Sequence, residues 1–173
     1  MKETYLVEIV LTNDKTIKLS LESKYAPRSV ENFINLVNKK YYDGTIFHRI
    51  IENFMIQTGG YKVEENTLME LDNIPSIEGE FASNNHPENT LKHELGVISM
   101  ARTSDKNSAT SQFFICAADC PWLDGEYAAF GKVVDEESKQ VVLEVSQVAT
   151  GNLGGGFTDF PYELIGIKTI NIL

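Results

Sequence analysis

Cysteine is scarce in this sequence of 173 residues, which contains only two of them, Cys116 and Cys120. If the segment between them is extended, their backbones lie roughly 13 Å apart at about 3.3 Å per residue, which exceeds the reach of a disulfide. The C-x-x-x-C spacing also differs from the C-x-x-C spacing of zinc and thioredoxin-type sites. We therefore expect two free thiols and a reducing, cytoplasmic setting.

Histidine is scarce as well, and His48, His86 and His93 share no metal-ligand spacing. His93 and Glu94 begin the zinc-protease pattern, but no second histidine follows at the required distance. There is no G-x-S-x-G nucleophile elbow. The three glycines 154–156 follow a predicted helix instead of opening one, which predicts a flexible turn and not a dinucleotide site. We expect neither a metal nor a cofactor.

Basic residues are outnumbered, with 15 Lys and Arg against 25 Asp and Glu and a net charge of -10. A field of that sign repels phosphate backbones and anionic lipids, so we expect no nucleic-acid or membrane partner. No stretch approaches the ~18 consecutive apolar residues of a membrane span. The first apolar run, residues 5–11, is interrupted by Glu8 and has no cleavage site, so it does not predict an export signal.

The apolar pattern predicts a single domain over residues 1–173, with an ordinary core, since 42% of the residues are hydrophobic. Residues 5–11 and the alternating residues 17–21 predict a hairpin with one buried face. Pro27, followed by an apolar stripe at i, i+3, i+4 and i+7, predicts a helix that ends before Gly44. A second helix is predicted over residues 136–148.

Strand-forming residues dominate six further segments: 45–51, 54–57, 96–101, 113–116, 128–134 and 165–172. With the hairpin they make about eight short strands beside only two helices. Because strands and helices do not alternate, a parallel α/β sheet is disfavoured. The pattern favours a mainly β fold, a closed eight-stranded antiparallel β-barrel capped by two α-helices, since closure removes exposed edges.

Two segments concentrate aromatic, Met, Gln and Arg side chains: residues 47–57 (FHRIIENFMIQ) and residues 111–125, which contain SQFFIC and WLDG. Phe and Met at strand spacing usually belong to a core. A half-buried Arg49 needs acceptors, and Gln57 could return beside it on the neighbouring strand. Gln112 is a second polar group in an apolar strand. An apolar groove with a few placed polar groups is typical of a binding or catalytic site.

Four sequence motifs follow one another along the chain: F-H-R-I-I-x-x-F-M-I-Q, G-V-I-S-M-A-R, S-Q-F-F-I-C and W-L-D-G-x-x-x-x-F-G-K-V. They resemble the cyclophilin family of peptidyl-prolyl cis-trans isomerases, over about residues 7–172, and are most similar to its bacterial cytoplasmic branch. The resemblance implies a cyclophilin-like barrel and a rotamase that assists protein folding as a chaperone. It also implies X-Pro peptides and proteins as partners, no cofactor, and a monomer.

The resemblance assigns two catalytic residues, Arg49 as a cationic donor to the prolyl nitrogen and Gln57 as its support. The substrate-binding positions that it implies are Phe54, Met55, Ala101, Arg102, Gln112, Phe114, Trp122, Leu123 and Tyr127, with Phe114 as the floor of a proline pocket. Strand alternation places Phe113 on the opposite face, in the core. We expect His48 to be a buried, hydrogen-bonded histidine without a catalytic role.

The sequence is compatible with three functions. The first is a prolyl isomerase, and the second is a proline-peptide binding module or chaperone with incidental turnover; Arg49 together with Gln57 favours the enzyme. The third is a lipocalin-type ligand barrel, which a filled interior would exclude. Arg102 and Tyr127 replace residues of the family's eukaryotic pattern beside the surface that binds cyclosporin, while Trp122 is retained, so affinity for cyclosporin-type cyclic peptides stays open.

Overall fold

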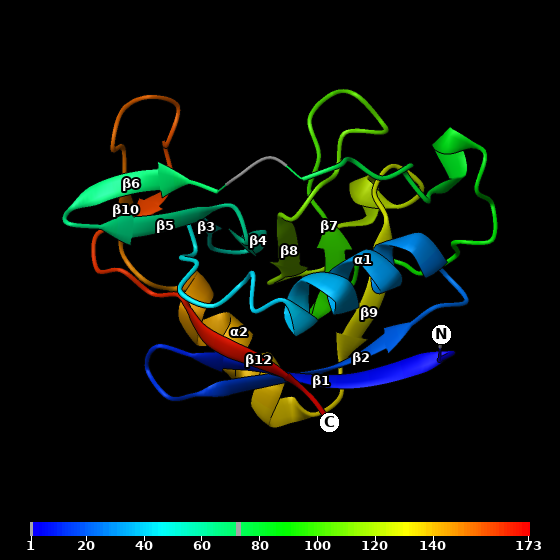
Figure 1. The fold of residues 1–173 in the computed structure, drawn as a ribbon, viewed down its shortest axis with the longest axis horizontal. Helices are drawn as coiled ribbons and strands as arrows, with labels where there is room; N and C mark the ends of the chain where they lie inside the picture. The colour runs from blue at the N-terminus through cyan, green and yellow to red at the C-terminus, as the bar shows by residue number, and fades with distance from the viewer. Residues whose placement is uncertain (1, 72–73) are drawn as a thin grey trace.

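The computed structural model describes residues 2–71 and 74–173, and eight of the strands in this part of the chain form one antiparallel sheet (Figure 1). The strand order is β12-β1-β2-β9-β7-β8-β4-β3. These strands are β1 (Thr4–Leu11), β2 (Thr16–Glu22), β3 (Arg49–Ile51), β4 (Met55–Thr58), β7 (Val97–Met100), β8 (Phe113–Cys116), β9 (Ala129–Val133) and β12 (Ile167–Ile172). Each of them overlaps one of the eight segments predicted as strands. The segment 45–51 is the most shortened, since only its last three residues form the strand.

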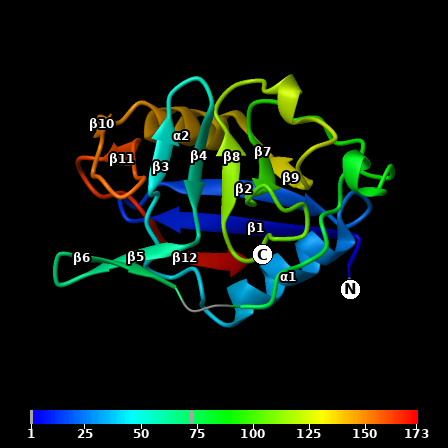
Figure 2. The ribbon, with the colours of Figure 1, turned by 90° about the horizontal axis from the view of Figure 1, so that it is seen from above.

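The remaining strands are short and were not predicted. They are β5 (Tyr61–Glu64) and β6 (Thr67–Glu70), which pair as a hairpin, and β10 (Thr150–Gly151) and β11 (Phe160–Pro161). The β5–β6 hairpin projects from one side of the molecule in both views (Figures 1 and 2). None of its strand residues is fully buried, so the two strands lack the apolar alternation that marks a strand with one buried face. Two 3-10 turns, η1 (Ala82–Asn84) and η2 (Pro121–Leu123), complete the described elements.

The two predicted helices are α1 (Pro27–Asn38) and α2 (Glu136–Ser146), which lie on opposite sides of the molecule in Figure 2 and bury residues in the same core. Pro27 stands in the first turn of α1, where its missing N–H costs no hydrogen bond. The side chain of Asp135 caps α2 by accepting the backbone N–H of Ser138 at 2.7 Å. Both helices therefore begin where the sequence predicted.

The prediction of a closed barrel is wrong, because the sheet is a curled half-barrel whose two edge strands, β12 and β3, do not pair with each other within the described residues. Ile46 and Gly166 form only an isolated bridge at this seam. The free edge of β3 is instead met by a loop, where Ile50 donates its N–H to the carbonyl of Asp159 at 3.0 Å. A three-residue strand with a loop along its edge leaves no ladder to close the barrel.

Fully buried side chains fill the interior of the half-barrel. Phe33 of α1 contacts Phe113 of β8 edge-to-face, with ring centroids 5.3 Å apart, and lies 5.5 Å from Phe130 of β9. Phe113 is thus a core residue, as strand alternation predicted. A filled interior excludes the lipocalin-type reading. Within residues 2–71 and 74–173, no helix combines the length and apolar character needed to cross a bilayer.

Candidate active site

The hairpin of β3 and β4 places Arg49 opposite Gln57. The chain reverses at Asn53, whose φ of +63° lies in the left-handed region that asparagine tolerates. The Nη1 atom of Arg49 donates to Oε1 of Gln57 at 3.4 Å, at the long limit of a hydrogen bond. The prediction that Gln57 returns beside Arg49 on the neighbouring strand is confirmed.

A second glutamine extends this contact. Gln57 donates from Nε2 to Oε1 of Gln112 at 2.9 Å, so Arg49, Gln57 and Gln112 form one chain of polar side chains. Gly60 makes room for it, since a Cβ atom there would lie 2.4 Å from Nε2 of Gln112. The polar chain restrains the guanidinium from one side.

A cavity of about 160 Å³ opens beside this polar chain. It is lined by Arg49, Phe54, Met55, Gln57, Ala101, Arg102, Phe114, Leu123 and Tyr127. Met55, Phe114 and Leu123 are buried, so the floor is apolar, whereas Arg49 is exposed at the mouth. The guanidinium carbon lies 5.9 Å from the ring centroid of Phe54, within cation–π range. A volume this small suits one compact apolar group below a fixed cation.

The structure brings together all of the predicted site residues except two, which lie just outside the cavity. Gln112 is one hydrogen bond away, through Gln57. Trp122 is 62% exposed and packs on Phe54 with ring centroids 5.9 Å apart, so it stands at the rim.

Arg102 is more constrained than the sequence indicated. Its guanidinium lies between the rings of Phe81 and Tyr127, 4.9 and 4.5 Å from their centroids. Its Nε and Nη2 atoms both donate to the carbonyl of Glu126, at 3.1 and 2.7 Å. The side chain therefore builds the cavity wall, and Tyr127 in turn packs edge-to-face on Phe114.

Sequence reasoning missed His93, which it tested only as a metal ligand. The His93 Nδ1 atom lies 3.1 Å from Oδ1 of Asp124, and Nε2 lies 2.9 Å from Oγ of Ser99. Burial lowers its pKa, which keeps the ring neutral near pH 7. Asp124, His93 and Ser99 contact one another in the same order as the acid, base and nucleophile of a hydrolytic triad. Ser99 is fully buried, however, and cannot reach a substrate. The three residues come from separate segments, and no sequence spacing signals them.

The prediction of a hydrogen-bonded His48 is wrong. The side chain is buried, but Nδ1 has no hydrogen-bond partner among the residues that the structure describes. The ring packs on Tyr61 with centroids 4.7 Å apart, and an aromatic face offers no conventional acceptor. Burial, assisted by the neighbouring positive charge of Arg49, lowers the pKa of His48 to about 4.

Cys116 and Cys120 are both free and buried. The chain bends at residues 117–118 after β8, so the assumption of an extended segment between the two cysteines is wrong, and the Cys120 thiol donates to the carbonyl of Phe54 at 3.6 Å. Burial raises the pKa of both thiols, which disfavours the reactive thiolate. Across residues 2–71 and 74–173, no cluster of three or more His, Cys, Asp or Glu side chains is placed to hold a metal ion.

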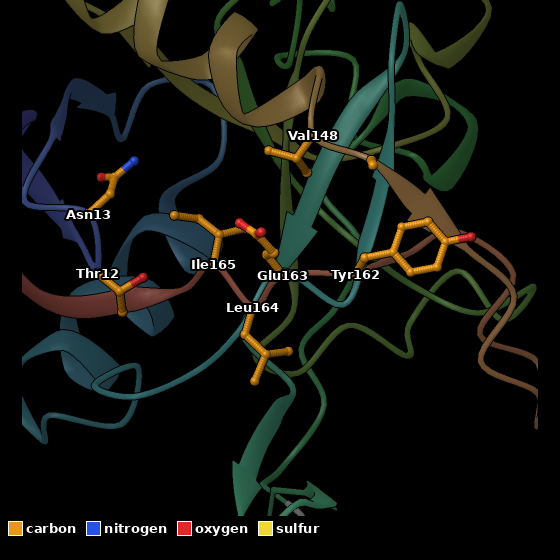
Figure 3. Close-up of a pocket in the computed structure, with 8 residues that line it drawn as sticks. Thr12, Asn13, Val148, Tyr162, Glu163, Leu164 and Ile165 are labelled. Atoms are coloured by element: carbon orange, nitrogen blue, oxygen red, sulfur yellow. The ribbon is translucent and has the colours of Figure 1, made fainter.

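A larger hollow of about 580 Å³ lies elsewhere on the surface (Figure 3). Its lining residues are Thr12, Asn13, Val148, Ala149, Tyr162, Glu163, Leu164 and Ile165. Figure 3 shows that Tyr162 points away from Thr12 and Asn13, so the polar groups do not converge on one point. The smaller cavity at Arg49, with its apolar floor and fixed cation, is therefore the candidate active site.

Comparisons with known proteins agree with this assignment. Residues 6–172 match the family model described as cyclophilin type peptidyl-prolyl cis-trans isomerase/CLD. Peptidyl-prolyl cis-trans isomerase A of Dickeya dadantii is 41% identical over 169 residues, which cover 95% of this chain and 80% of that protein. Peptidyl-prolyl cis-trans isomerase B of Escherichia coli (strain K12) is 34% identical and covers 93% of this chain and 96% of its own length.

Solved structures show the same likeness. A cyclophilin type peptidyl-prolyl cis-trans isomerase of Cryptosporidium parvum superposes with a TM-score of 0.76 at 28% identity, over 98% of each chain. A second structure of that protein was determined in the presence of the dipeptide Ala-Pro, and it superposes with a TM-score of 0.75 at 29% identity, over 97% of this chain and 98% of that one. The family match spans nearly the whole sequence, and this chain belongs to the cyclophilin-type peptidyl-prolyl cis-trans isomerases.

Proposed function

We propose that this isomerase accelerates rotation about X-Pro bonds by directing Arg49 at the prolyl nitrogen while the cavity below grips the proline ring. Rotation faces a barrier of about 18–20 kcal/mol because twisting the amide removes its resonance. In the twisted state the prolyl nitrogen regains a lone pair. A donor aimed at that lone pair stabilises the transition state and neither planar isomer, so it raises the rate.

One observation carries the proposal: an exposed cation stands at the mouth of a cavity whose floor is apolar and buried. Gln57 and Gln112 would orient the guanidinium and hydrogen-bond the substrate backbone. The ring would be held by Phe54, Met55, Phe114 and Leu123, and the peptide would run past Ala101, Arg102, Tyr127 and Trp122. Rotation breaks no covalent bond, so these residues supply everything that the chemistry needs.

The experiment compares Arg49→Ala and Arg49→Lys with the native protein, measuring cis-to-trans exchange of an X-Pro peptide and, separately, its Kd. We expect Arg49→Ala to lower kcat at least about tenfold, which corresponds to about 1.4 kcal/mol of lost transition-state stabilisation, with Kd changed less than about twofold. Lysine keeps the charge but lacks the planar fork, so its rate should lie between the two. Native-like exchange in Arg49→Ala would disprove the role of Arg49. Binding without any acceleration in the native protein would favour the binding-module reading.

The proposed setting is a monomer acting as a single domain in a reducing cytoplasm, with X-Pro segments of folding proteins as substrates. The two buried free thiols support the compartment. The dipeptide Ala-Pro used with the related parasite protein supports the substrate class. The exposed Trp122 at the rim supports binding of cyclosporin-type cyclic peptides, which calorimetric titration would test.

A further inference from the structure

A second cavity, of about 230 Å³, lies on the other side of Arg49. It is lined by His48, Arg49, Tyr61, Gly155, Gly156, Phe157, Thr158 and Asp159. Because Arg49 lines both cavities, a peptide held in the active site can extend into this one. We propose that the second cavity is a substrate subsite for the carboxamide side chain of an Asn or Gln residue near the proline. The proposal rests on the proposed function.

The strongest observation is the unpaired nitrogen of His48. The side chain is 6% exposed, and its Nδ1 atom lacks a partner in the described part of the chain. A buried polar atom left unpaired costs about 1–3 kcal/mol, so a ligand that pairs with it regains part of that cost. Neutral imidazole has one donor and one acceptor nitrogen. A carboxamide carries both a donor and an acceptor, so it can pair with Nδ1 in either tautomer.

The shape and charge of the cavity also favour a planar, neutral group. The rings of Tyr61 and Phe157 meet edge-to-face, with centroids 5.2 Å apart, and the His48 ring lies 4.7 Å from that of Tyr61. Arg49 and Asp159 place opposite charges on the lining. A charged side chain would be attracted by one of them and repelled by the other, whereas a dipolar amide can satisfy both.

Access to Nδ1 requires the aromatic cluster to open, and the adjoining loop allows this. Gly154, Gly155 and Gly156 have φ values of +92°, +61° and +90°. A Cβ atom on Gly154 or Gly156 would meet nothing within 4 Å in the described structure, so this turn is loosely packed. Segments with few packing contacts open at low free-energy cost. The proposal requires that this turn shift together with Phe157, whose ring lies 6.3 Å from that of His48, when the side chain of the peptide enters.

The test uses X-Pro peptides that carry either Gln or Met, which match in length, at each of three positions on either side of the proline. We expect kcat/KM to favour Gln about three- to tenfold at one position, the range for one neutral hydrogen bond. In His48→Phe, which keeps the ring but removes Nδ1, that ratio should fall to about one. Tyr162→Phe removes a polar group from another aromatic side chain, outside both cavities, so it should keep the native ratio.

Two further measurements make the result decisive. The ¹⁵N resonance of His48 Nδ1 should shift on binding of the preferred Gln peptide and not on binding of its Met counterpart. Phe157→Leu, at a partly exposed loop position, should also reduce the ratio because it removes a wall of the cavity. Equal turnover of Gln and Met peptides at every position, with an unmoved Nδ1 resonance, would overturn the subsite. A native protein that accelerates neither series would instead overturn the proposed function.

Discussion

The His93 ring lies nearly parallel to the Phe114 ring, at an interplanar angle of 19° with centroids 6.0 Å apart. This places a buried, hydrogen-bonded histidine directly behind the floor of the candidate active-site cavity. The partners of His93 are Ser99 on β7 and Asp124, which follows Leu123 of the cavity lining. The floor of the cavity and one of its walls are therefore held by the same side chain.

Replacing His93 with Phe should keep the stacked ring but remove the partner of Ser99 and leave Asp124 with only the backbone N–H of residue 93. We expect the free energy of unfolding to fall by about 2–3 kcal/mol, since two buried hydrogen bonds are lost. KM should rise more than kcat falls, because the change reshapes the pocket without touching Arg49. Denaturant unfolding and steady-state kinetics measure both effects, with the surface variant Glu52→Gln as a control. A drop in kcat alone would contradict a positioning role.

Replacing Gln112 with Leu should lower kcat about three- to tenfold, because Gln57 loses its partner and holds Arg49 less firmly. The check is a double-mutant cycle with Gln57→Leu. If the two glutamines act through one chain, the double variant will be little slower than Gln57→Leu alone. Additive losses would show that Gln112 acts on the substrate independently.

Glu80 caps the N-terminus of α1 and should therefore contribute to the stability of the fold. Its buried carboxylate accepts the backbone N–H of Arg28 at 3.1 Å and of Ser29 at 2.7 Å, at the N-terminus of α1. It thus acts as the cap that Ala26 does not supply. Glu80→Gln should lower the free energy of unfolding by about 1–2 kcal/mol, because a charge-assisted bond at a helix N-terminus is lost.

The matched control is Glu78→Gln, since Glu78 makes only an exposed ion pair with the side chain of Arg28. An exposed ion pair contributes about 0–1 kcal/mol, so this variant should stay close to the native stability. Chemical denaturation of the three proteins in parallel gives the comparison. Equal losses at positions 78 and 80 would refute the capping role of Glu80.

His48 makes stability depend on pH. Its pKa is about 4 in the folded protein against 6.5 ordinarily, so between these values the unfolded chain binds a proton that the folded chain does not. The free energy of unfolding should therefore fall as pH drops from 6.5 to 4, by up to about 3 kcal/mol from this residue. The stability difference between the native protein and His48→Phe, measured by urea unfolding at several pH values, should shrink or reverse over this window. A difference that stays constant with pH would contradict the prediction.

Only part of the candidate site was predictable from the residues themselves, and the positions from Ala101 to Tyr127 were assigned by the family resemblance because they lie on separate strands and loops. Arg49 and Gln57 flank one short hairpin, and strand alternation alone separates Phe113 from Phe114. His93 was not predictable, because its partners lie on different segments and only the folded chain brings them together. The open edge between β3 and β12 was not predicted for a related reason. Whether these two strands pair depends on the loop at Asp159, which lies far from β3 in the sequence. The exposed β5–β6 hairpin gave no periodic signal.

The pairing of β1 with β12, seen in the register Val7↔Ile172, has a consequence for biosynthesis. As the chain leaves the ribosome, the β1–β2 hairpin forms early, but the outer edge of β1 stays unsatisfied until β12 has been translated. An unpaired apolar edge is a site for association between chains. A stalled or prematurely released nascent chain is therefore expected to aggregate through β1, and this isomerase would itself depend on shielding of that edge until β12 has been translated.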